Sequence, residues 1–134
     1  MNPVSVTKGP VMYALFFPAG MKVEGAQFLT KQTDDFQVGL MERQAGYEVK
    51  AHQHPSMNRT LTTTSEFLYF EKGKAEVTVF DEEWNELGRH TVSAGDFLVF
   101  LRGGHRMKVL EPARMIEVKQ GPYPGDGSAK VFRD

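Results

Sequence analysis

The sequence predicts an all-β domain. Its 13 glycines and 7 prolines punctuate the chain at short intervals. The segments between them are short and rich in Val, Phe, Tyr, Leu and Thr, which is typical of β-sandwiches and barrels. No segment keeps a 3.6-residue apolar period, so little helix is expected. A length of 134 residues suits one domain, spanning 1–134.

The first half of the chain is expected to contain four strands, each ended by a turn signal or a polar stretch. The apolar run 11–17 stops at Pro18-Ala19-Gly20, and Gly46 separates two later strands. The polar segment 55–65 then follows, either as a flexible loop or as part of a strand edge. The predicted strands are 11–17, 26–29, 36–43 and 46–54.

The second half is expected to contain six strands. Lys72-Gly73-Lys74 joins two of them so tightly that a hairpin is predicted. A polar loop, Asp81–Asn85, carries the only Trp and makes the next reversal. The tail 121–134 is rich in Gly and Pro and is expected to wrap the surface or a neighbouring subunit. The predicted strands are 65–71, 74–81, 87–92, 96–101, 104–110 and 113–120.

Composition excludes several classes of function. The formal net charge is -1 and the charges are well mixed, which argues against nucleic acid or an anionic membrane as partner. Cysteine is absent, so disulfides and thiolate metal sites are excluded, and a reducing cytoplasm is the expected location. The N-terminus has no signal-peptide pattern, and the longest apolar stretch, 11–19, is too short to span a bilayer.

Four side chains form a candidate metal-ligand set: His52, His54, Glu66 and His105. Residues two apart in a strand point to the same side, so one extended segment aims His52 and His54 into the same space. If the strands that carry the four residues face one another, three imidazoles and a carboxylate suit Zn, Fe(II), Mn, Ni or Co. The alternative is that these histidines hold no metal, since an isolated H-x-H is usually ordinary polar surface.

Two motifs resemble those of the cupin superfamily. Gly46-x5-His52-x-His54 followed by Glu66-x6-Gly73 is similar to the first cupin motif, and Gly95-Asp96 through His105 to the second. The resemblance covers about residues 36–118. It implies a double-stranded β-helix, or jelly-roll barrel, with the four residues above as metal ligands. It further implies kinship with small single-domain cupins, some of which are linked to surface-sugar metabolism.

Three further residues are candidate substrate contacts. The guanidinium of Arg59 matches a carboxylate or phosphate, although a solvated loop charge is the simpler explanation for this residue taken singly. Glu117 and Lys119 share one face of a strand; facing into the barrel they would supply an acid–base pair, and facing outward they would be solvated. Phe67 and Tyr69 alternate with Glu66, Leu68 and Phe70, so both strand faces are apolar. A second subunit would cover the outer one, which predicts a homodimer.

Three functions remain open from the sequence. The first is a metal-dependent enzyme, an isomerase or oxygenase, acting on a small polar metabolite such as a sugar or another carbonyl or carboxylate compound. The second is a non-catalytic module that binds such a metabolite. The third is a structural dimer whose histidines hold no metal.

Overall fold

Strands dominate the computed structural model, which describes residues 2–133, and the all-β prediction is confirmed. The single helical element is one turn near the C-terminus, also within these residues. The elements are β1 (Val4–Lys8), β2 (Val11–Phe17), β3 (Gly25–Phe28), β4 (Gly39–Glu42), β5 (Glu66–Phe80), β6 (Glu86–Ser93), β7 (Phe97–Phe100), β8 (Gly104–Lys119) and α1 (Asp126–Ala129).

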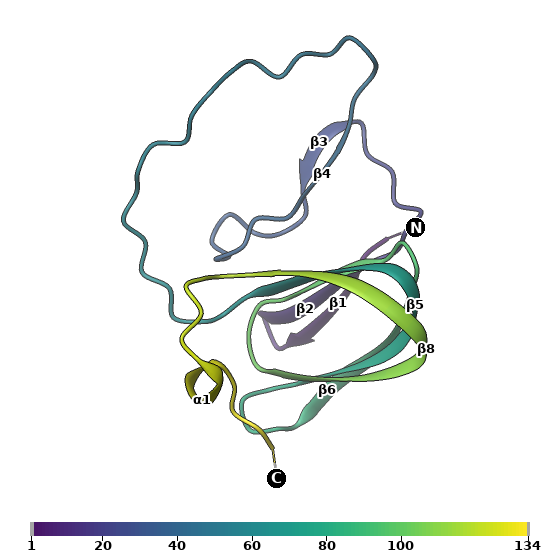
Figure 1. Cartoon of the computed structure of the whole chain (residues 1–134), viewed down its shortest axis with the longest axis vertical. Helices are drawn as coiled ribbons and strands as arrows, with labels where there is room; N and C mark the ends of the chain where they lie inside the picture. The colour runs from purple at the N-terminus through teal and green to yellow at the C-terminus, as the bar shows by residue number, and fades with distance from the viewer. Residues whose placement is uncertain (1, 134) are drawn as a thin grey trace.

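One antiparallel sheet of six strands curls into a half-barrel (Figure 1). Its order is β1-β2-β7-β5-β6, and β8 pairs with β5 from one end to the other. On its other edge β5 pairs first with β7 and then with β6. The long strand β5 therefore organises the sheet. β3 and β4 form a separate hairpin.

The ribbon made by β5 and β8 bends in its middle, at Gly73. The register shifts repeatedly between Phe70 and Ala75, and Gly73 has φ of 93°. A side chain at Gly73 would collide with the carbonyl oxygen of Pro112, because the two bent strands touch there. The predicted hairpin at Lys72-Gly73-Lys74 is therefore wrong, as is the predicted break at Pro112. The irregular backbone bends two continuous strands instead.

The concave side of the sheet holds the main core. The inward-facing side chains alternate along each strand, as the pleat requires. At its centre, strands β5, β7 and β2 contribute fully or nearly fully buried residues, with Val92 from β6: Leu68, Phe70, Ala75, Val77, Val79, Leu98, Phe100, Ala14 and Phe16.

A second apolar cluster lies on the convex side of β2 and β7. Its buried members are Leu15, Phe17, Val99 and Leu101, and the segment after β2 covers them with Met21, Leu29, Phe36 and Val38. Phe67 lies at the margin of this cluster, with its ring 5.9 Å from that of Phe97. Part of the outer face is thus covered by this chain itself, while the homodimer stays a prediction.

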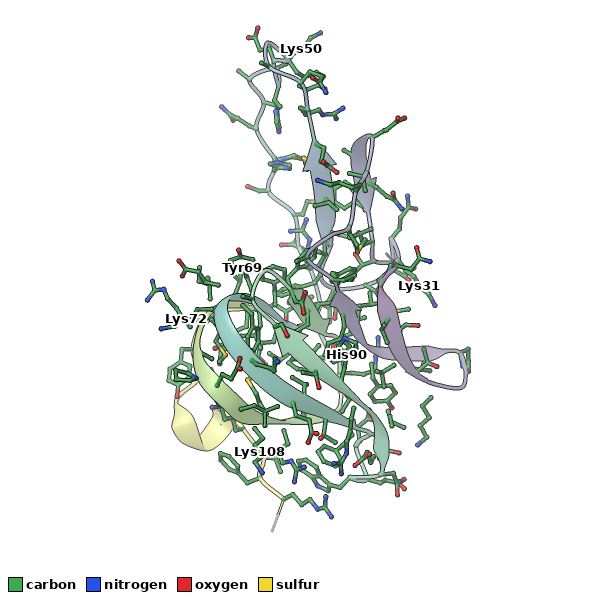
Figure 2. The ribbon with its side chains drawn as sticks, turned by 90° about the vertical axis from the view of Figure 1, so that its right-hand side faces the viewer. Lys31, Lys50, Tyr69, Lys72, His90 and Lys108 are labelled. Carbon is green, nitrogen blue, oxygen red and sulfur yellow. The ribbon has the colours of Figure 1, made fainter. Side chains whose placement is uncertain are left out.

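The segment 43–65 connects β4 to β5 as a long arc and contains no strand (Figure 1). Every side chain from residue 43 to 62 is exposed. Figure 2 shows Lys50 at the far end of this arc, well away from Tyr69 and Lys72 on the sheet. The predicted strand 46–54 is wrong, because no neighbouring strand supplies hydrogen bonds. The predicted strand 36–43 shortens to 39–42, whereas 11–17 is confirmed.

The predicted reversal at 81–85 is confirmed, and Asp81 organises it. The Asp81 side chain, 1% exposed, accepts hydrogen bonds from Lys8 Nζ, the Glu83 and Asn85 backbone N–H groups, and Asn85 Nδ2. The hydrogen bond from Lys8, together with that from the Asn85 backbone, holds the pKa of Asp81 far below its usual range. The strand β1, which supplies Lys8, was not predicted.

Candidate functional site

Glu66 and His105 meet on the concave side of the sheet. Glu66 begins β5 and pairs with Lys119, while His105 pairs with Val79 near the other end of the same strand. The bend at Gly73 folds the ribbon back on itself, so that Glu66 Oε2 lies 3.4 Å from His105 Nε2. Glu66 shares its face with Leu68 and so points into the half-barrel.

His105 lies flat against Phe100. The two rings are nearly parallel, at 3°, with centroids 3.9 Å apart. Burial lowers the pKa of His105, which the nearby Glu117 carboxylate opposes. At neutral pH the imidazole is therefore uncharged, which is the form that binds metal ions.

Glu117 completes a carboxyl pair with Glu66. Burial, followed by a hydrogen bond with Glu117, raises the pKa of Glu66 to about 7. The same hydrogen bond lowers the pKa of Glu117. One proton is therefore shared between the two groups near neutral pH, residing on Glu66. Glu117 thus lies on the concave face beside Glu66, with its side chain 40% exposed to solvent.

Two lysines bring positive charge to this cluster. Lys119 Nζ lies 3.7 Å from Glu117 Oε1 and 5.9 Å from the centre of the Tyr123 ring. Lys130, which follows α1, is close enough to lower the pKa of both Glu66 and Glu117. The tail therefore reaches the cluster, in agreement with a tail that wraps the surface.

The other predicted site residues lie apart from this cluster, in the exposed segment 43–65. The rings of His52 and His54 are 5.3 Å apart, and His52 Nδ1 lies 2.7 Å from the Lys50 carbonyl oxygen. Arg59 Nη2 donates to Met57 Sδ at 3.4 Å and contacts no other predicted site residue. The four predicted metal ligands are thus brought together as two pairs.

The two pairs differ in how well they fit a metal ion. Glu66 and His105 fit once Glu66 gives up its proton, because a carboxylate and a neutral imidazole then converge on a partly buried point. His52 and His54 have suitable chemistry but lie on the arc. Within residues 2–133, no group of three or more His, Cys, Asp or Glu side chains is placed to hold an ion.

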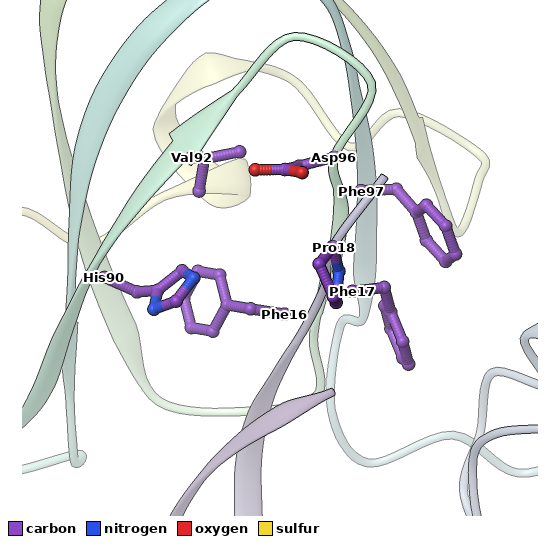
Figure 3. Close-up of a pocket in the computed structure, with 7 residues that line it drawn as sticks. All are labelled: Phe16, Phe17, Pro18, His90, Val92, Asp96 and Phe97. Carbon is purple, nitrogen blue, oxygen red and sulfur yellow. The ribbon is translucent and has the colours of Figure 1, made fainter. Parts of the chain in front are cut away.

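A small cavity elsewhere is unrelated to this cluster. Its volume is about 10 Å³, room for one water, and its walls include Phe16, Asp96 and Phe97 (Figure 3). His90 also lines it and packs against Phe16, with ring centroids 4.7 Å apart. His90 is half-buried.

Two residues of the cluster escaped the sequence analysis. Phe100 alternates with Leu98 and so points inward, and it stands just before the Gly103-Gly104 turn that leads to His105. This position in the sequence could have indicated that the Phe100 ring lies against the His105 imidazole. Lys130 has no such signal, because the course of the tail depends on contacts distant in sequence.

Comparison of the chain with protein families, curated proteins and solved structures gives no match. Among residues 2–133, no helix has the length and apolar character needed to cross a lipid bilayer.

Proposed function

We propose that the protein binds a divalent metal ion through His52, His54, Glu66 and His105 and takes a small polar metabolite at that ion. The observation that carries the proposal is the 3.4 Å approach of Glu66 to His105 on the concave side of the sheet. A carboxylate and a neutral imidazole are common ligands of Zn, Fe, Mn, Ni and Co.

The proposal also includes a specific type of β fold. A double-stranded β-helix of the cupin type is supported by the strong curl of the sheet and by the shared bend of β5 and β8. It is also supported by the motifs around His52 and His105. Binding one ion with all four ligands requires the segment 43–65 to lie against the Glu66–His105 pair. Metal binding is often coupled to such local folding.

The bound ion would act as a Lewis acid toward a carbonyl, carboxylate or hydroxyl oxygen. The chain's own residues would do the rest. Once Glu66 is a ligand, Glu117 is free to hold or accept a proton at its carboxylate. Lys119, 3.7 Å from it, would attract an anionic or carbonyl oxygen of the metabolite. A sugar-like carbonyl compound is the substrate class that the cupin resemblance implies.

A non-catalytic binding module is the second candidate. It would use the same metal and the same residues without turnover, and the partly exposed position of the Glu66–His105 pair suits capture as well as chemistry. The exposed apolar side chains of β8, Leu110, Ile116 and Val118, support a homodimer. The absence of cysteine suits a cytoplasmic location.

Metal analysis of the purified protein tests the proposal. The protein is stripped with a chelator, reloaded and measured by mass spectrometry, and one ion per chain is expected. Glu66→Gln and His54→Ala should each weaken metal binding by tenfold or more, on the order of what a lost ligand contact costs. His90→Ala is the matched control and should retain the ion. Metal loss in the control alone, or no metal in the native protein, would contradict the proposal.

Glu117→Gln then separates the two candidates. For an enzyme, this variant should keep its metal and its ligand affinity while losing turnover by about 100-fold or more. For a binding module, the native protein should bind sugars or keto acids without converting them.

A further inference from the structure

A second, polar groove lies away from the Glu66–His105 pair. It has a volume of about 150 Å³, and its walls come from three separate parts of the chain. The loop between β3 and β4 supplies Asp34 and Asp35, the end of the 43–65 segment supplies Thr62, Thr63 and Ser65, and Arg102 follows β7. Ser65 and Glu66 are consecutive, so their side chains point to opposite faces of the sheet. The groove therefore lies on the other face of the sheet from Glu66 and His105.

The walls of this groove are held in place by hydrogen bonds. Gln37 Nε2 donates to the carbonyl oxygens of Lys31 and Asp34, both at 2.9 Å, which fixes the loop that carries the two aspartates. Ser65, 1% exposed, donates its backbone N–H to Gln120 Oε1 at 2.7 Å. A groove formed before its ligand arrives loses less entropy on binding.

The charged groups are also oriented, and each keeps capacity for a ligand. Arg102 Nε donates to the Met12 carbonyl oxygen at 3.1 Å, which leaves both Nη groups without a partner within residues 2–133. Asp34 Oδ2 accepts from the Lys31 backbone N–H at 2.8 Å, and Asp35 Oδ2 from Thr63 Oγ1 at 3.2 Å. The Oδ1 atom of each aspartate has no hydrogen bond in the described part of the chain.

We propose that this groove binds a small zwitterionic amino acid. Arg102 would hold the ligand carboxylate through paired N–H donors, and Asp34 with Asp35 would hold its ammonium group. The hydroxyls of Thr62 and Thr63 suit a polar side chain. An anion alone would be repelled by the two aspartates, and a simple cation would leave Arg102 without a partner. The volume of about 150 Å³ is enough for a molecule of a few carbon atoms.

Titration calorimetry of the native protein tests this proposal directly. The probes are glycine, L-serine, L-glutamine and L-lysine, with N-acetyl-L-glutamine, L-glutaminamide and sorbitol as controls. At least one free amino acid should bind at one site per chain. N-acetylation removes the ammonium and amidation removes the carboxylate, so each should weaken binding by about tenfold or more. Equal binding of the blocked probes or of sorbitol would overturn the proposal, as would no binding by any of the four amino acids.

Three variants locate the site. Asp34→Asn and Arg102→Gln should each weaken binding of the amino acid by about tenfold or more. Arg106→Gln, which removes an exposed arginine of β8 outside the groove, should leave the affinity unchanged. Unchanged affinity in both groove variants would place the ligand elsewhere and overturn the proposal. If a variant does not fold, the blocked probes on the native protein decide the question.

Discussion

Glu66 Oε2 lies 3.4 Å from His105 Nε2, although the two residues stand near opposite ends of the β5–β8 ribbon. The approach depends on the bend at Gly73, where both strands turn together. The candidate site is thus a consequence of one irregular position in the sheet. A substitution at Gly73 should therefore lower the stability of the protein and disturb the Glu66–His105 pair.

Gly73→Ala should destabilise the protein by about 2–4 kcal/mol. The new Cβ would need φ of 93° and would lie 2.5 Å from Ala113 Cα, besides meeting the Pro112 carbonyl oxygen. Gly46→Ala is the matched control: φ there is 90°, but no atom lies within 4 Å of the new Cβ. It should cost only the backbone strain, about 1 kcal/mol. Urea unfolding measures both, and equal losses would show that the strands do not touch at Gly73.

The metal-free protein should lose stability as pH rises from about 5 to 7. The pKa of Glu66 rises from 4.5 to about 7 on folding, so the folded state keeps a proton there that the unfolded state releases. Glu66 should lower the free energy of unfolding by about 1–3 kcal/mol across this window, and His105, whose pKa is lowered by burial, should offset a smaller part of that fall. Below pH 4.5 the lowered pKa of Glu117 acts in the opposite direction, and stability falls as pH falls.

Glu66→Gln should remove the decline between pH 5 and 7, because the amide does not titrate. Glu111→Gln, on the exposed part of β8, is the control and should keep it. Urea midpoints at several pH values measure the effect. If stability still declines between pH 5 and 7 in Glu66→Gln, another titrating group is responsible for the decline.

Asp81→Asn should destabilise the protein at pH 7 and have a clearly smaller effect near pH 2. The pKa of Asp81 is lowered by folding, so its contribution to stability is present above about 4 and is lost as pH falls through the folded pKa. Glu83→Gln, in the same turn, should leave stability unchanged. Thermal unfolding followed from pH 7 to pH 2 checks this. The same loss at both ends of the range would mean that the carboxylate charge does not matter.

Trypsin should cut the metal-free protein at Lys50 and Arg59, because both lie in the exposed arc outside any strand. If a metal ion draws His52 and His54 to the Glu66–His105 pair, cleavage at both sites should slow by tenfold or more with metal. Cleavage at identical rates with and without metal would argue that the segment stays where it is.

Much of the sheet could be predicted from alternation and turn residues. The run 11–17 is bounded by Pro18 and matches β2, and strands β6 and β7 agree within one residue with prediction. The hairpin predicted at Gly73 was wrong because a glycine with positive φ suits a hairpin turn and a bend within a strand equally well. Only the pairing of β8 along the whole of β5 distinguishes the two, and that pairing is not local.

In the segment 46–54 the prediction was wrong in the opposite way, because a strand was expected where none forms. Its residues have a suitable pattern for a strand, but a strand needs a neighbour, and propensity does not supply one. For the same reason, the sequence could place Glu66 and His105 at strand starts without showing which strands converge. The inward direction of Glu117 follows from its pairing with Leu68, a contact between distant parts of the chain.

Anomalous diffraction from crystals grown with the metal that co-purifies tests the central claim most directly. The account predicts one peak per chain, about 2.0–2.2 Å from nitrogen or oxygen atoms of Glu66, His105, His52 and His54. A peak that touches His52 and His54 but not Glu66 and His105, or no peak within the half-barrel, would contradict it.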